Sequence, residues 1–277
     1  RISRLRALAT RMTSSVAAQT RFLDGVEASV SSVLKKYGDV DVKSIPPAER
    51  EAFVVARLLD DRLQQLAKKS CCRICWLPRH LCICDRCISL EATSSKPLPK
   101  VKRIFLLMHP NEICLKCDTA KLIMMAFPET CRLVVGGISP EFQDSLREME
   151  DALKHSNCLV LFPAEEARQF KEIESSSKSE PVDGWDIVII DGTWSQANRL
   201  HSRYVSPGAN YVQLSEDAVK NLASASEKAK DGHQLRYHPE KWREVSTLEA
   251  TRLFLGEMMP SSNQRPWNVL AKYQQIS

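Results

Sequence analysis

Several features that would identify common protein classes are missing from this sequence. No apolar run approaches the roughly 20 residues that cross a bilayer, and the first residues lack the short apolar block of a secretory signal. The sequence also lacks both common glycine-rich phosphate loops, a GxSxG turn and a metalloprotease helix. We therefore expect a soluble, intracellular protein with no membrane partner, and we disfavour nucleotide-triphosphate enzymes, dinucleotide enzymes and hydrolases.

Aromatic residues are scarce too, at 6%, although 43% of the 277 residues are hydrophobic. This length allows one large domain with an appendage, or two small domains. The net charge of +5 permits a polyanionic partner such as nucleic acid without requiring one. Only basic residues carry charge before Asp24, a composition shared by organellar transit peptides and by basic helix faces. Cytoplasm, nucleus and an organelle are all open as compartments.

The sequence pattern divides the chain into three parts. Helical periodicity over 24–69, interrupted at 44–50, predicts an N-terminal helical region, which we assign to residues 1–70. A cysteine-dense segment follows and is assigned to residues 71–90. The Ser/Pro/Lys-rich residues 91–100 have the chemistry of a linker and mark the expected domain boundary.

The third part, residues 91–277, alternates short apolar runs with amphipathic segments. The expected strands are 103–108, 132–137, 158–162 and 186–190, and the expected helices are 119–127, 140–155 and 193–204. Fully apolar strands that alternate with helices indicate an α/β fold with a parallel sheet covered on both faces. Residues 171–184 are polar and predict a surface loop.

Six of the ten cysteines lie between residues 71 and 87. A CxxC pair and a CxC pair, six residues apart, are formed by Cys72, Cys75, Cys82 and Cys84. Two close pairs that meet across a short turn can surround a zinc ion with four sulfur ligands, so we predict a structural zinc knuckle. Reduced thiols or disulfides are the alternative, although intracellular proteins rarely contain disulfides. Cys71, His80 and Cys87 are neighbours that could replace a ligand.

Polar motifs follow two of the predicted strands. His109 to Glu112 comes after the first, and a DGTW motif that begins at Asp191 comes after the last. Ligands of open α/β sheets bind outside the carboxyl ends of the strands, so both motifs are expected at one rim. Gly192 would let the main chain approach a ligand, and Trp194 offers a surface for base stacking. In the simpler alternative, Asp191 caps the next helix and His109 is a turn residue.

Six motifs occur in order along the chain. They are the CxxC and CxC cysteines, HPNE at 109–112, LFP at 161–163, DGTW at 191–194, LR at 235–236 and STLEA at 246–250. Together, over about residues 71–255, they resemble the DTW-domain family, the tRNA-uridine aminocarboxypropyltransferases. This resemblance implies a SPOUT-like α/β fold with a C-terminal trefoil knot that binds S-adenosylmethionine. The zinc knuckle and the N-terminal helical region would precede it.

The resemblance also implies a reaction with tRNA as partner. The 3-amino-3-carboxypropyl group of S-adenosylmethionine, a donor substrate, would move to N3 of a tRNA uridine and leave methylthioadenosine. N3 is a poor nucleophile while it is protonated, so the reaction needs a positioned base, for which Asp191 is the candidate. Its carboxylate could also interact with the cationic sulfonium.

Supporting roles follow for the other motif residues. Those implied to surround the donor are Leu161, Phe162, Pro163, Gly192, Thr193, Trp194, Leu235, Arg236, Ser246, Thr247 and Glu249. His109 and Glu112 would face the acceptor or the amino-acid arm. Arg199 and Arg203, four residues apart, would point toward phosphate or form a solvated face.

Two other functions are open at this point. One is an S-adenosylmethionine-dependent RNA methyltransferase of the same fold class, and the other is a zinc-containing RNA-binding protein without activity. Residues 1–70 lie outside the resemblance, and tRNA binding, dimerisation and targeting are all open as their role. The oligomeric state and the modified uridine are open too.

Overall fold

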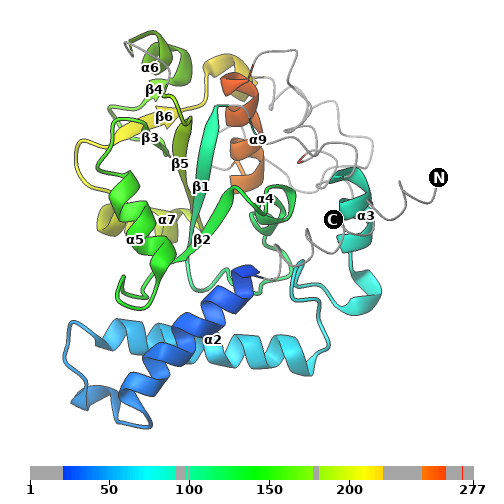
Figure 1. Cartoon of the computed structure of the whole chain (residues 1–277), viewed down its shortest axis with the longest axis vertical. Helices are drawn as coiled ribbons and strands as arrows, with labels where there is room; N and C mark the ends of the chain where they lie inside the picture. Colours follow the sequence, from blue (N-terminus) through cyan, green and yellow to red (C-terminus); the bar gives the residue numbers. More distant parts are fainter. Residues whose placement is uncertain are drawn as a thin grey trace.

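The computed structural model describes residues 21–91, 98, 100–176, 181–220, 245–259 and 270. Within these residues, six parallel strands form one sheet in the order β2-β1-β5-β3-β6-β4 (Figure 1). They are β1 (Val101–Met108), β2 (Cys131–Val135), β3 (Cys158–Leu161), β4 (Arg168–Gln169), β5 (Trp185–Asp191) and β6 (Asn210–Gln213). The prediction of a mixed α/β fold with a parallel sheet is confirmed.

Helices cover both faces of the sheet. They are α4 (Lys121–Ala126), α5 (Asp144–Ala152), α6 (Phe170–Ser176), α7 (Trp194–Tyr204) and α9 (Thr247–Met258). Phe105 and Leu107 of β1 belong to the hydrophobic cluster that includes α5 and α7, whereas Ile104 and Leu106 belong to the cluster of α4, α6 and α9. All four side chains are fully buried. A strand buried on both faces needs an apolar side chain at every position, which explains the apolar runs in the sequence.

The helix predicted over residues 140–155 is shorter in the structure. The side chain of Gln143 accepts a hydrogen bond from Val135 N at 2.6 Å and donates one to Val135 O at 3.0 Å. These bonds hold Gln143 in an extended conformation, with φ −138° and ψ 100°, so α5 begins only at Asp144.

The prediction of a surface loop over residues 171–184 is wrong for residues 171–176, which belong to α6. Phe170 and Ile173 are both buried. The Phe170 ring meets the rings of Trp185 and Phe254 edge-on, with centroids 5.9 and 6.0 Å apart. Contacts with residues far along the chain therefore stabilise a helix that its polar sequence does not indicate.

The predicted N-terminal helical region is present and packs on the sheet domain. Residues 21–37 are helical, and α2 (Arg50–Lys68) follows the 3-10 turn η1 (Val42–Ser44). Figure 1 shows this region below the sheet. Buried residues of both helices, such as Val33 and Leu59, belong to the same hydrophobic cluster as the sheet residues facing α4 and α9. Among the described residues, the helices are too short or too polar to span a bilayer.

Along the chain, the cysteine-dense segment follows α2 and precedes β1. It contains the 3-10 turn η2 (Arg79–Leu81) and continues into α3 (Cys84–Glu91). Most of the predicted linker at 91–100 lies outside the described residues, as do residues 221–244, where part of a trefoil knot would form. The knot and the domain boundaries near residues 70 and 90 therefore stay predictions.

Candidate functional site

A cavity of about 540 Å³ lies at the carboxyl ends of β3, β5 and β6. We call it the strand-end cavity. Its wall consists of the strand ends, the start of α7, the helical residues 216–220 and the start of α9. Small-molecule sites in proteins have volumes of roughly 300–1,000 Å³, so this cavity can enclose a ligand the size of a nucleoside or a cofactor.

Several predicted donor-binding residues meet in this wall. Those that line the strand-end cavity are Leu161, Phe162, Pro163, Gly192, Trp194 and Thr247. Thr193, Ser246 and Glu249 lie at the helix starts next to lining residues. Leu235 and Arg236 lie outside the described residues. The sequence did not indicate Gln213, which also lines the cavity, because β6 is a short strand of mixed polarity. Glu216 of the following helical residues lines the cavity too and was not indicated either.

The DGTW turn places a glycine where no side chain fits. Thr193 is the N-cap of α7: its Oγ1 accepts a hydrogen bond from Gln196 N at 3.4 Å, and Gln196 Oε1 accepts one from Thr193 N at 2.7 Å. Such a reciprocal pair is a capping box. Gly192 has a φ of +151°, and a Cβ there would lie 3.0 Å from Gln196 Cβ and 3.3 Å from His109 Cβ. Glycine therefore allows the capping side chain and the neighbouring strand end to approach closely.

Asp191 is the last residue of β5 and is only 5% exposed. The sequence left open whether it caps the following helix, but the N-cap is Thr193. Its neighbours Ile190 and Gly192 line the strand-end cavity. Buried carboxylates are uncommon in proteins, and this one directly adjoins the cavity wall.

His109 begins a loop that follows β1, which we call the His109 loop (residues 109–113). Asn111 N donates a hydrogen bond to His109 Nδ1 at 3.1 Å, so the neutral ring carries its proton on Nε2. Burial lowers the pKa of His109, and the guanidinium groups of Arg199 and Arg62 lower it further. Near neutral pH the ring is therefore uncharged and offers Nε2–H as a hydrogen-bond donor.

The other predicted acceptor-binding residues have different surroundings. Glu112 is half-buried, and its backbone N–H donates to His109 O at 2.9 Å within the turn. Arg199 is exposed on α7. Arg203 forms an ion pair with Glu51 of α2. Arg199 thus presents its charge to solvent near the rim, whereas Arg203 helps α7 to pack against α2.

Trp194 belongs to an aromatic stack. Its indole lies parallel to the Phe162 ring, with centroids 5.7 Å apart and an angle of 2°. Phe162 stacks in turn on His201 at 4.3 Å, and His201 Nε2 lies 3.1 Å from Tyr211 Oη. Trp194 is 43% exposed, so much of the indole is accessible to a ligand. His201 was not among the residues that the sequence motifs indicated, although its seven-residue distance from Trp194 places both on one helix face.

The start of α9 forms another part of the cavity wall. Ser246 is the N-cap: its Oγ accepts from Glu249 N at 3.3 Å and donates to Glu249 Oε2 at 2.9 Å. The S-x-x-E spacing of these two residues is the sequence signature of such a helix start. Thr247 follows the cap and lines the strand-end cavity. The N-terminus of a helix carries partial positive charge and favours anionic groups.

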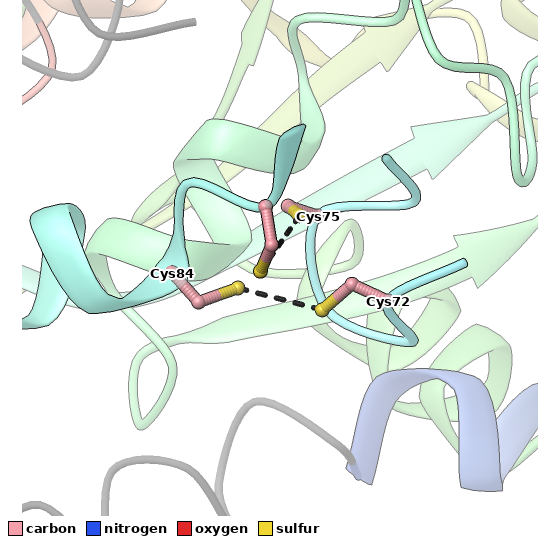
Figure 2. Close-up of side chains that lie close together, drawn as sticks. Cys72, Cys75 and Cys84 are labelled. Carbon is pink, nitrogen blue, oxygen red and sulfur yellow. Dashed lines mark hydrogen bonds between the residues drawn. The ribbon is translucent and has the colours of Figure 1, made fainter. Parts of the chain in front are cut away.

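Four cysteines form a group that could hold a metal ion, which we call the cysteine cluster. The sulfur atoms of Cys72, Cys75, Cys82 and Cys84 all lie within 4.8 Å of one another. Figure 2 shows the sulfur atoms of Cys72 and Cys84 facing each other, with Cys75 on a neighbouring turn of the chain. Tetrahedral metal–sulfur bonds of about 2.3 Å place neighbouring sulfurs about 3.8 Å apart. The separations are 3.5 Å for Cys72–Cys84 and 3.7 Å for Cys75–Cys82, so the four thiols fit a tetrahedral metal.

Hydrogen bonds between thiols of the cysteine cluster shift their pKa values in opposite directions. Hydrogen bonds from Cys75 and Cys84 lower the pKa of Cys72. The hydrogen bond with Cys72 is the main cause that raises the pKa of Cys75, to about 11, and that of Cys84. A divalent cation supplies the positive charge that lets all four thiols ionise. The possible substitute ligands Cys71, His80 and Cys87 are not part of this group.

Comparisons with known proteins decide the family. The family model described as DTW domain matches residues 69–276, which is most of the chain. The chain belongs to the DTW-domain family. Its DTW domain contains the cysteine cluster and all the residues that line the strand-end cavity, whereas residues 21–37 and α2 come before it.

Two curated relatives of this DTW-domain chain are named tRNA-uridine aminocarboxypropyltransferase 2. The protein from Macaca fascicularis is 27% identical over 164 residues, which are 59% of this chain and 51% of the relative. The protein from Mus musculus is 29% identical over 130 residues, which are 47% of this chain and 40% of the relative. The chain thus spans about half the length of these relatives or less. No solved structure matches it.

Proposed function

We propose that this protein is a tRNA-uridine aminocarboxypropyltransferase, with S-adenosylmethionine as donor and N3 of a tRNA uridine as acceptor. The observation that carries the proposal is the strand-end cavity. Residues of three motifs that are distant in the sequence, LFP, DGTW and STLEA, line this one cavity. Membership of the DTW-domain family and the printed names of the two relatives support the same activity.

The reaction needs one proton transfer and one substitution. A base removes the proton from N3, and N3 attacks the carbon of the aminocarboxypropyl group that is bonded to sulfur. The new C–N bond forms as the C–S bond breaks, and the electron pair of the C–S bond returns to sulfur. The products are the substituted uridine, neutral methylthioadenosine and the protonated base. In-line placement of N3, carbon and sulfur is the main requirement on the site.

Asp191 is our proposed base. It adjoins the cavity wall at the end of β5, and its low exposure excludes most water from its surroundings. Electrostatic interactions are stronger where water is excluded, which favours both proton abstraction and attraction of the sulfonium. A base must come within about 2.6–3.2 Å of the atom that carries the proton. The uridine must therefore leave its stack and enter the cavity mouth, where Trp194 can stack on it.

The donor is proposed to occupy the strand-end cavity itself. Leu161–Pro163 and the start of α9 would contact its adenosine and methionine parts, with the helix N-terminus favouring the carboxylate. Leu235 and Arg236 would complete the site within a SPOUT-like trefoil knot. The parallel order β5-β3-β6, whose carboxyl ends surround the cavity, supports this proposal. Structural zinc is proposed for the cysteine cluster, because four sulfur ligands leave no open position for chemistry.

Mass spectrometry of nucleosides from tRNA incubated with S-adenosylmethionine tests the function. The wild-type protein should form aminocarboxypropyluridine and release methylthioadenosine. Asp191→Asn should lose about 10²- to 10⁴-fold in rate, the usual contribution of a general base, and should still bind the donor in calorimetry. Asp183→Asn is the matched control: this carboxylate lies just before β5 and is 74% exposed, so activity should persist.

Two results would replace the proposal with one of the other functions. A methylated base without an aminocarboxypropyl product would indicate an RNA methyltransferase. Absence of donor binding by the folded wild-type protein would indicate an RNA-binding protein without activity. If Asp191→Asn retained full activity, Asp191 would not be the base even though the transferase function stood.

A further inference from the structure

Arg62 extends from α2, outside the DTW domain, to the His109 loop. Its Nη1 donates hydrogen bonds to the carbonyl oxygens of Asn111, at 2.5 Å, and Ile113, at 2.8 Å. Helix α2 cannot easily shift relative to the loop, because its inner face is buried in the core through Leu59, Leu63 and Leu66. One guanidinium group thus bridges two carbonyl groups of a loop about 50 residues away in the sequence.

Hydrogen bonds continue from this contact to the candidate site. Arg62 binds the carbonyl of Asn111, and the N–H of Asn111 donates to His109 Nδ1 at 3.1 Å. The N–H of His109 donates in turn to the carbonyl of Asp191 at 3.0 Å. A displacement of Asn111 would therefore alter the orientation of the His109 ring, while the main-chain bond to Asp191 holds the base of the loop.

The charges around His109 fit this arrangement. Arg62 from α2 and Arg199 from α7 both lower the pKa of His109, after burial as the main cause, whereas Glu51 raises it. On the α2 side of the loop, the Arg62 guanidinium is therefore a cation that donates hydrogen bonds to the loop's carbonyl groups. The ring remains uncharged beside it.

We propose that Arg62 is a positioning residue that holds the His109 ring with Nδ1 bonded to Asn111, so that Nε2–H is the atom available to substrate. This inference rests on the proposed function, because it places His109 on the acceptor side of that site. It also assigns residues before the DTW domain a role in the site: α2 acts through Arg62 on a loop of the catalytic domain.

Three measurements on Arg62→Ala test the inference. Hydrogen exchange of the amides of residues 111–113 should accelerate about tenfold or more, since the loop loses its two bonds to α2. The imidazole NMR titration of His109 should shift to higher pH as the ring loses the nearby cation and part of its burial. In the modification assay, kcat should fall about 10- to 100-fold while the KM for the donor changes little, because only acceptor alignment is lost.

Two further variants separate positioning from a general effect on folding. Arg57→Ala removes another arginine of α2, which is 58% exposed and lies 3.6 Å from Asp39, and it should behave as wild type. Arg62→Lys keeps a cationic donor and should recover most of the exchange protection.

The inference would be overturned if Arg62→Ala left exchange and the His109 titration unchanged, or if Arg57→Ala had the same effects. It would also be overturned if Arg62→Lys recovered none of the exchange protection. Exchange and titration require no substrate. They therefore test Arg62 even if the wild-type protein modifies no tRNA, an outcome that would refute the proposed function alone.

Discussion

The backbone N–H of His109 donates a hydrogen bond to the carbonyl oxygen of Asp191, with N and O 3.0 Å apart. It extends the parallel ladder in which Met108 is paired with Asp191. The register of β1 and β5 therefore brings the HPNE and DGTW motifs together, although 82 positions separate His109 from Asp191.

Gly192→Ala should damage the turn before α7. The new Cβ would lie 3.0 Å from Gln196 Cβ and 3.1 Å from Gln196 Oε1, at a φ of +151° that side chains rarely adopt. We expect the free energy of unfolding to fall by about 1–3 kcal/mol, and donor affinity to fall at least about tenfold because the cavity wall moves. Urea denaturation and calorimetry measure these changes. Gly208→Ala has a positive φ but nothing within 4 Å of its Cβ, so it should cost less. Equal losses would contradict the importance of the close approach.

Stability should decline below neutral pH because of two histidines. Burial is the main cause that lowers the pKa of both His109 and His201. In the unfolded chain both return to the ordinary value of 6.5, so as the pH falls below it the unfolded state binds more protons than the folded state. Their contribution to stability should be complete above that value and be lost as the pH falls toward the folded pKa values.

Urea denaturation between about pH 5 and 8 measures this decline, since histidine titrates in that range. His109→Gln and His201→Gln should each make the decline shallower. The same change at His155, which is exposed, should leave it as in wild type. An unchanged slope in the double variant would rule out these histidines as its source.

Metal analysis should find about one zinc ion per chain, the stoichiometry of one four-sulfur site. Cys84→Ser should lose the metal and melt at a lower temperature, and a strong chelator should do the same to the wild type. Cys117→Ser should keep its metal, because Cys117 is exposed and lies outside the cysteine cluster. Full metal content in Cys84→Ser would show that the metal binds elsewhere.

Loss of metal should also change the fluorescence of Trp76. This side chain is 1% exposed and follows the cluster residue Cys75. The ammonium group of Lys121 lies 5.6 Å from its ring centroid. Opening of the cysteine cluster should expose Trp76 to water and shift its emission to longer wavelength. An unchanged spectrum on demetallation would mean that the segment keeps its fold without metal.

Arg199→Ala should weaken tRNA binding with little effect on the donor. Arg199 is exposed and close enough to His109 to lower the pKa of that ring, and under the proposed function its charge would contact a phosphate group of tRNA. Removing one phosphate contact should reduce the slope of log affinity against log salt by about one. Filter binding at several salt concentrations measures the slope, with Arg57→Ala as a control of equal charge. A slope that changes equally in both variants would argue against a specific contact at Arg199.

The sequence predicted the central strands and helices well, because their burial is visible in local patterns. Residues 186–190 are apolar without interruption, as a strand covered on both faces must be. Helix α6 could not be read in the same way, since the ring contacts of Phe170 are with Trp185 and Phe254. Strand β6 was missed because only Tyr211 and Val212 of its four residues are buried.

The candidate site was predictable where a motif has a local physical cause. Ser246 and Glu249 show a helix start by their spacing alone, and the T-x-x-Q spacing of Thr193 and Gln196 offered the same signal, which was overlooked. No local pattern indicates that Arg62 bonds the His109 loop, because that contact depends on how α2 packs against the sheet.

The core shared by the N-terminal helices and the sheet has a practical consequence for recombinant work. A fragment that starts at residue 69, where the DTW match begins, would lose Val33, Leu59 and the other buried side chains of both helices. The apolar surface left behind would face water and promote aggregation. The cooperative folding unit of this protein is therefore larger than the stretch that matches the DTW-domain model, and expression boundaries should lie before residue 21.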